Sequence, residues 1–118
     1  MPVEDYVRNA RVTRVVDGDT LEVEIDLGFH TWVKKRIRVL GVDTPEIKGE
    51  TRDAGIAAAK ATRGWVASAC GDIQIRTHLD KVDSFGRILA EIWSGKESLG
   101  RYLIEAGHAV AYLVRKAK

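Results

Sequence analysis

The sequence predicts an α+β fold in which five short β-strands close into a barrel and two helices pack against it. Three observations lead to this prediction. Apolar and polar residues alternate in three segments before residue 45 and in two more after residue 72, a helical period separates the two groups, and a second helical segment follows the last strand. A chain of 118 residues with 45% apolar content can fill one hydrophobic core, so we expect a single domain over residues 1–118.

The first three strands form a predicted meander. Apolar residues alternate with acidic ones over residues 21–27, which is typical of a half-buried strand. Residues 12–16 would pair with it, because the Asp-Gly pair in residues 17–19 is a common hairpin turn. A third strand is expected over residues 31–42, where apolar and basic side chains occupy opposite parities.

Helical spacing of alanines predicts the main helix over residues 53–70. Asp53 is its expected N-cap, and Gly71 follows its end. Gly64 in the interior costs about 1 kcal/mol relative to alanine, so we expect it to allow close packing against a neighbouring strand. Cys70 is expected to be a small buried side chain near the end of the helix.

Strand patterning returns over residues 73–79 and 88–93, which should form a second hairpin. An amphipathic helix then spans residues 99–106, with Ser98 as its N-cap and Gly107 as its stop. The resulting order, βββ-α-ββ-α, fits the five-stranded oligonucleotide-binding barrel (OB-fold), which leaves one face for ligands.

Composition narrows the functional classes. The formal net charge is +2 with 31% charged residues, a balance that permits nucleic-acid binding without requiring it. A single cysteine excludes an intrachain disulfide and a cysteine-based metal site. Residues 1–12 contain no apolar run of signal-peptide length and no segment is long enough to cross a membrane, so a cytoplasmic location without membrane contact is the default expectation, or a secreted one if a leader was removed. A monomer is the default expectation for the oligomeric state.

Carboxylates gather at two predicted strand ends. Asp17 and Asp19 share one turn, and Asp43 and Glu46 lie in the segment VDTPE. Clustered hard oxygen ligands suit Ca²⁺ or Mg²⁺ rather than zinc. Each motif alone also has an ordinary explanation, namely a surface turn for the first and a helix cap with Pro45 at the first helical position for the second.

Two arginines favour a functional explanation. Arg38 precedes Asp43 by five residues and has the parity opposite to Ile37, so it should leave the core beside the carboxylates. Arg87 ends the turn formed by residues 83–87. Either arginine alone could be an exposed surface cation. Further basic residues could likewise steer a polyanion or simply be solvated, namely Lys34, Lys35, Arg36, Arg115, Lys116 and Lys118.

The ordered motifs VVDGDT, R-x4-DTPE and DSFGR resemble those of the staphylococcal nuclease (thermonuclease) family over nearly the whole chain. The resemblance implies an OB-fold of the staphylococcal nuclease type. It also implies calcium-dependent hydrolysis of phosphodiester bonds in DNA and RNA, with 3′-phosphate products. By the same resemblance Asp19 and Asp43 supply carboxylate oxygens to Ca²⁺, Thr44 supplies its backbone carbonyl, and Asp17 lies just behind these ligands.

The resemblance also assigns the catalytic residues. Arg38 and Arg87 would stabilise the negative charge that develops on the phosphate, because guanidinium holds two oxygens at once and stays ionised. Glu46 would act as general base toward the attacking water. Tyr112 would flank the bound nucleotide.

Three positions depart from the family pattern and predict weaker nucleotide binding. Ser84 stands in place of a lysine, Phe85 in place of a tyrosine, and Val114 in place of a second nucleotide-flanking tyrosine. The alternatives to an active nuclease are a catalytically weak or inactive OB-fold nucleic-acid-binding module and a calcium-stabilised structural domain. The presence of Asp19, Arg38, Glu46 and Arg87 counts against the first alternative, and the retention of both arginines counts against the second.

Overall fold

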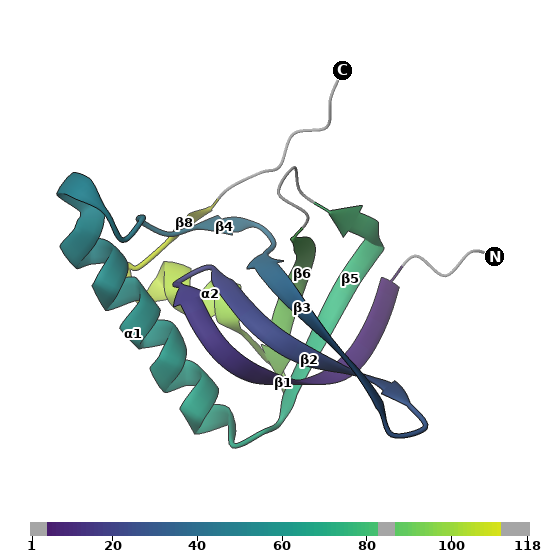
Figure 1. Ribbon diagram of the computed structural model, residues 1–118. Helices are drawn as coiled ribbons and strands as arrows, with labels where there is room; N and C mark the ends of the chain where they lie inside the picture. Colours follow the sequence, from purple (N-terminus) through teal and green to yellow (C-terminus); the bar gives the residue numbers. More distant parts are fainter. Residues whose placement is uncertain (1–4, 83–86, 112–118) are drawn as a thin grey trace.

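The computed structural model describes residues 5–82 and 87–111, with side chains from residue 7 to 77 and from 87 to 111. Five strands close into a barrel (Figure 1). They are β1 (Asp5–Asp17), β2 (Thr20–Gly28), β3 (Thr31–Val39), β5 (Ile73–Val82) and β6 (Ile88–Ser94). Neighbouring strands run antiparallel in the order β3-β2-β1-β5-β6, and a parallel pairing of β3 with β6 closes the barrel. The predicted fold class is therefore confirmed.

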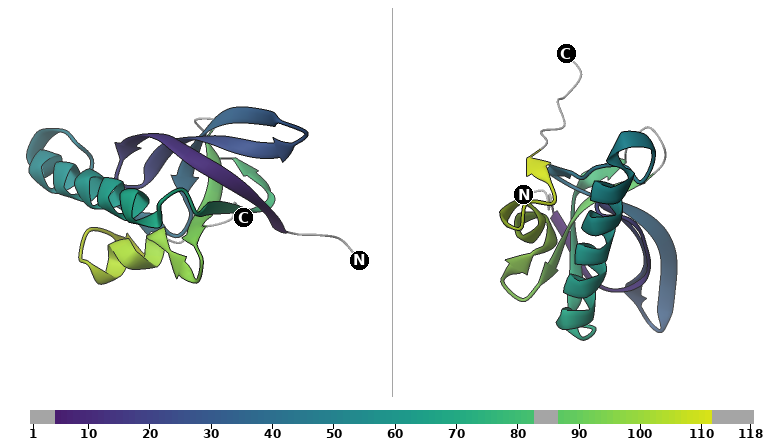
Figure 2. Two further views of the ribbon diagram at one scale, coloured as in Figure 1. Left: turned by 90° about the horizontal axis from the view of Figure 1, so that it is seen from below. Right: turned by 90° about the vertical axis from the view of Figure 1, so that its left-hand side faces the viewer.

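The remaining elements lie around the ends of the barrel. A 3-10 turn, η1 (Gly49–Thr51), leads into helix α1 (Arg52–Ala69), and α2 (Leu99–Glu105) follows the last barrel strand. Both helices lie at the same end of the barrel and contact each other (Figure 2). Short strands β4 (Val42–Asp43) and β8 (Val110–Ala111) pair with each other, and β7 (Glu97–Ser98) pairs with β6.

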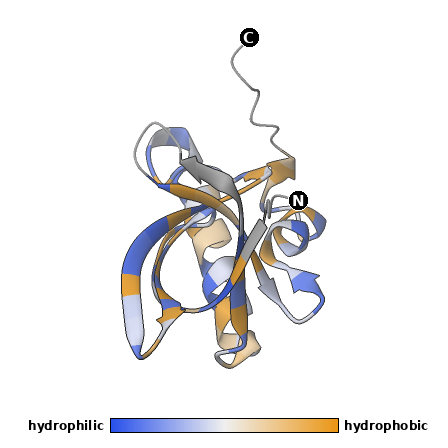
Figure 3. Ribbon diagram, turned by 90° about the vertical axis from the view of Figure 1, so that its right-hand side faces the viewer, coloured by the Kyte–Doolittle hydropathy of each residue, from blue (hydrophilic) through white to orange (hydrophobic). Residues whose placement is uncertain are grey.

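Alternation along the strands places one set of apolar residues inside the barrel, and Figure 3 shows the alternating hydropathy. Residues of β2, β3, β5, β6 and α2 fill the core. The largest fully buried apolar side chains are Leu21, Ile37, Ile75, Ile92, Leu99 and Leu103. Complete burial of each such side chain contributes about 1.5–3 kcal/mol to folding. Among the described helices, none is long and apolar enough to cross a bilayer.

Two strands differ in length from the prediction. β1 starts at Asp5 rather than near residue 12, because its first half pairs with β5 while its second half pairs with β2. β3 ends at Val39 rather than at residue 42, because Gly41, with φ 89°, redirects the chain before β4.

Three expectations for the main helix were wrong. Helix α1 begins at Arg52 with Thr51 as N-cap, so Asp53 lies in the first turn and is not the cap. A Cβ on Gly64 would meet nothing within 4 Å, so this glycine does not serve close packing. Cys70 is exposed, because it ends the helix in a left-handed conformation with φ 52°. The cap of α2 is confirmed, since Ser98 Oγ accepts from the backbone N–H of Arg101 at 3.0 Å.

Candidate active site

The two-residue turn between β1 and β2 is packed tightly against α1. A Cβ on Gly18 would lie 2.8 Å from the Cβ of Ala58 and 3.0 Å from the side chain of Thr44, so only glycine fits without displacement. Thr62 Oγ1 donates to the carbonyl of Gly18 at 2.7 Å. The turn is thus fixed between the helix and the segment after β4, and this fixes Asp19.

Asp19 connects the turn to three neighbouring segments. Its side chain is buried, with Oδ2 accepting from the backbone N–H of Thr44 at 3.0 Å and Oδ1 accepting from the hydroxyl of Thr20 at 3.2 Å. Oδ2 also lies 3.3 Å from Nη1 of Arg38. Buried carboxylates are stable when they are paired and hydrogen-bonded in this way.

Arg38 leaves the core beside the carboxylates, as its parity predicts. Its guanidinium donates to the carbonyls of Val39 at 3.0 Å and Val42 at 2.7 Å, and to Oδ1 of Asp43 at 3.1 Å. Only 13% of the Arg38 side chain is exposed, whereas 52% of the Asp43 side chain is exposed. The guanidinium is therefore held in one position, and Asp43 lies at the open side of the site.

Barrel closure brings the second arginine to the same place. In the parallel pairing of β3 with β6, Ile37 is opposite Ile88 and Arg38 is opposite Leu89. Arg87 immediately precedes β6, and its Nη1 donates to Oγ1 of Thr20 at 3.3 Å.

The segment after β4 carries Glu46 in neither helix nor strand, so the interpretation of Pro45 as the first residue of a helix is wrong. The side chain of Glu46 is 69% exposed, and its Oε1 lies 3.3 Å from Nζ of Lys48. Its backbone is held more firmly, because Thr51 Oγ1 donates to the Glu46 carbonyl at 2.7 Å. Gly55 of α1 approaches the same carbonyl so closely that a Cβ would lie 2.6 Å from its oxygen.

These residues line one cleft of ≈ 320 Å³. The cleft contains all the metal-binding and catalytic residues that the family resemblance predicts. The lining residues are Asp17, Asp19, Arg38, Asp43, Thr44, Pro45, Glu46, Ile47, Lys48 and Arg87. The predicted nucleotide-flanking Tyr112 and the departures at Ser84, Phe85 and Val114 lie outside the described residues.

The electrostatics of the cleft show a concentration of negative charge. Burial raises the pKa of Asp17 above its ordinary value, and the carboxylates of Asp19 and Glu46 raise the pKa further. Arg87 and Arg36 act in the opposite direction. Among the described residues, the cleft is lined by four acidic side chains and three basic ones, so the basic side chains compensate the acidic charge only in part.

The donor set fits a hard divalent cation. Within the described part of the chain, no three histidine, cysteine or acidic side chains are close enough to hold a metal by themselves. The residues implied by the resemblance are instead two carboxylates, from Asp19 and Asp43, and the carbonyl of Thr44, which all lie at this cleft. Oxygen donors of this kind suit Ca²⁺, and the partly uncompensated negative charge favours a cation.

Several contributors were missed by sequence reasoning. Lys48 lines the cleft, and its position two residues after Glu46 in the sequence could have indicated this. Thr62 falls four residues after Ala58, on the same face of α1, so helical spacing could have placed it at the turn. The roles of Thr20 and Gly55 depend on contacts between distant segments and have no local signal.

Comparisons with known proteins agree with this geometry. Residues 36–118 match the family model described as staphylococcal nuclease homologue. A thermonuclease of Staphylococcus hyicus is 34% identical over 110 residues, which cover 89% of this chain and 60% of that protein. A thermonuclease of Staphylococcus intermedius is 34% identical over 105 residues, covering 85% and 57%. Endonuclease YncB of Bacillus subtilis (strain 168) is 33% identical over 110 residues, covering 89% and 49%.

Fold and site together define a small OB-type barrel with an acidic cleft bordered by two arginines. The matched residues extend from β3, which carries Arg38, to the end of the chain. The chain belongs to the staphylococcal nuclease family. It spans 49–60% of the length of the three relatives described above.

Proposed function

We propose that this protein is a calcium-dependent phosphodiesterase that hydrolyses DNA and RNA and leaves 3′-phosphates. The observation that carries the proposal is the convergence of Arg38 and Arg87 with Asp19, Asp43 and Glu46 at one cleft. A purely acidic cleft would repel a phosphodiester, whereas two fixed guanidinium groups at its border provide donors for the phosphate oxygens.

Asp19, Asp43 and the carbonyl of Thr44 are the proposed calcium ligands. When bound, the cation would neutralise phosphate charge and polarise the attacking water. Asp19 is suited to this role because the turn at Gly18 and the Thr44 N–H fix its carboxylate. Asp43 is half-exposed and can reach an ion at the mouth of the cleft.

Arg38 and Arg87 are the proposed donors to the transition state. Attack on a phosphodiester increases negative charge on the equatorial oxygens, so fixed donors stabilise the transition state more than the substrate. Two backbone carbonyls and two carboxylates already orient Arg38, so little ordering is needed during reaction. Loss of either arginine is expected to cost roughly 3–4 kcal/mol, or about 10²–10³-fold in rate.

Glu46 is the proposed general base. Its carboxylate is exposed to the water that would attack, while hydrogen bonding and close packing hold its backbone. Replacement by glutamine retains the shape but not the charge. Glu46→Gln is therefore expected to lower kcat more than it weakens substrate binding.

Digestion of plasmid DNA and of RNA tests the proposal. The wild-type protein should cleave both with millimolar calcium and neither with chelator, and Arg87→Ala should reduce kcat by about 10²-fold or more. Arg101→Ala is the matched control, because Arg101 is an exposed arginine paired with Glu105 on α2, away from the cleft. Binding of nucleic acid without calcium-dependent cleavage would reject the enzyme and support the non-catalytic binding module.

A further inference from the structure

The tip of the β2–β3 hairpin combines strain with exposure. Phe29 and His30 form the tip with φ values of 57° and 60°. A turn with two such residues normally takes asparagine and glycine, because a bulky side chain is strained at positive φ. Phe29 is nonetheless 98% exposed, so its ring gains almost no burial in return. A strained and exposed aromatic residue indicates a binding role rather than a structural one.

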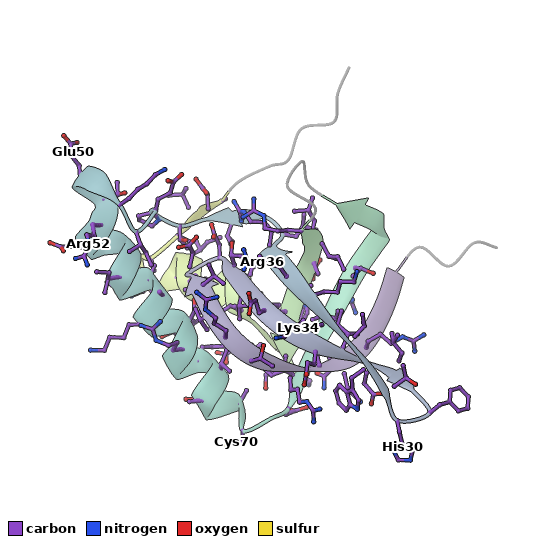
Figure 4. All side chains as sticks on the ribbon, viewed as in Figure 1. His30, Lys34, Arg36, Glu50, Arg52 and Cys70 are labelled. Carbon is purple, nitrogen blue, oxygen red and sulfur yellow. The ribbon has the colours of Figure 1, made fainter. Side chains whose placement is uncertain are left out.

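A row of side chains connects this tip with the candidate active site. Arg38, Arg36, Lys34 and Trp32 occupy alternate positions of β3 and therefore share one face of the strand. Arg38 lies six positions after Trp32 along the strand, which corresponds to a distance of about 20 Å. Figure 4 shows Arg36, Lys34 and His30 in succession toward the tip.

An arginine already stacks on an aromatic ring beside the tip. The guanidinium carbon of Arg11 lies 4.0 Å from the ring centroid of Trp32, and Trp32 is 39% exposed. Aromatic rings and arginine planes are the groups on which unpaired bases stack.

Electrostatic attraction along this row is limited. Glu22 lies 2.6 Å from Arg36, and Glu24 lies 2.7 Å from Arg11. Paired cations attract phosphate less strongly than unpaired ones, so stacking must supply much of any affinity for a strand. The same pairing makes the hairpin a poor ligand for anionic membranes, which are recognised by clusters of uncompensated basic residues.

We propose that this hairpin row binds single-stranded nucleic acid extending from the active cleft, with a base stacked on Phe29. The hairpin row consists of Trp32, Lys34 and Arg36, which share one face of β3, together with Phe29 at the tip of the hairpin. The proposal rests on the proposed nuclease function and adds a strand-binding surface outside the cleft. A single strand is the occupant, because bases paired inside a duplex are not available for stacking on a side chain. Polymeric single strands are then preferred to short oligonucleotides, which reach only the cleft.

Fluorescence anisotropy with labelled DNA strands of 3 and 12 nucleotides, in the presence of chelator, tests this assignment. Phe29→Asn suits the turn and should raise Tm while raising the Kd for the 12-mer by about fivefold or more. The Kd for the 3-mer should not change. Phe29→Trp should restore tight binding of the 12-mer, and Ile104→Gln, at a 40% exposed apolar position on α2, is the matched control.

The proposal is overturned if Phe29→Asn binds the 12-mer as tightly as the wild type does, or if both strands lose affinity equally. It is also overturned if Phe29 instead controls sedimentation with phosphatidylserine vesicles or self-association while binding of the 12-mer is unchanged. The assay needs no cleavage, so a failure of the proposed hydrolysis appears separately, as a wild-type protein that binds strands but does not cut them with calcium.

Discussion

Gly55 sets the distance between helix α1 and the segment that carries Glu46. A Cβ at this position would lie 2.6 Å from the carbonyl oxygen of Glu46, 2.7 Å from its carbonyl carbon and 2.9 Å from the backbone nitrogen of Ile47. All three atoms belong to backbone, so no side-chain rotation relieves the clash. To reach an ordinary contact of 3.4 Å, Gly55→Ala must move the helix and the segment apart by about 0.8 Å.

The effects on stability and on activity differ in size. Alanine gains about 1 kcal/mol of helix propensity over glycine, and overpacking costs about 1–3 kcal/mol. The net loss of stability is therefore about 0–2 kcal/mol, and the protein remains folded. Displacement of a reacting group by about 1 Å costs on the order of 10²-fold in rate. We expect Gly55→Ala to reduce kcat by about 10²-fold because it displaces Glu46.

Gly64→Ala is the matched control, because it lies in the same helix and its Cβ would meet nothing within 4 Å. It should gain about 1 kcal/mol of stability and retain wild-type kcat. Calcium-dependent cleavage of a short oligonucleotide gives kcat, and urea unfolding gives stability. A Gly55→Ala protein with wild-type kcat, or a Gly64→Ala protein equally impaired, would refute this account of how Glu46 is positioned.

Three further outcomes follow from the site. Burial raises the pKa of Asp17, so this group favours folding below its ordinary pKa of 3.8 and loses that contribution as pH rises through the raised pKa. With chelator present, Asp17→Asn should therefore unfold at a higher urea concentration than the wild type at pH 7, but not below about pH 3.8. Calcium at 100 times its Kd should stabilise the wild type by about 2.7 kcal/mol and so raise its Tm. Scanning calorimetry should show a much smaller rise in Tm for Asp43→Asn. Thr62→Val removes the donor to the buried turn at Gly18 and should cost about 1–3 kcal/mol in urea unfolding, whereas Thr62→Ser should retain most of this stability.

The barrel could be predicted because apolar and polar residues alternate over several positions of each strand, so the pattern does not depend on any single side chain. The extension of β1 to Asp5 could not be predicted, since residues 5–10 are held by pairing with β5, more than sixty residues later in the chain. Strands β4 and β8 contain two residues each, too few for any period.

The site residues that belong to the sequence motifs could be predicted. Arg38 emerges beside Asp43 as its parity indicates, because β3 alternates regularly up to Val39. The close-packed glycine of α1 was not predictable from the sequence, because the expected position, Gly64, makes no close contact and Gly55 does. Gly55 and Gly64 are nine residues apart, which is two and a half helical turns, so they occupy opposite faces of α1. Only the fold shows which face meets the segment of Glu46.

The parallel pairing of β3 with β6 has a consequence for folding. It joins Ile37 to Ile88, about fifty residues apart along the chain, and contacts of such separation carry a high entropic cost and slow folding. Arg38 belongs to this pairing and Arg87 immediately precedes it, so a chain that has formed the β1–β2–β3 meander but not the closure does not bring the two cations together. The proposed hydrolysis therefore requires the completed barrel, and recovery of activity during refolding should coincide with closure rather than with formation of the first three strands.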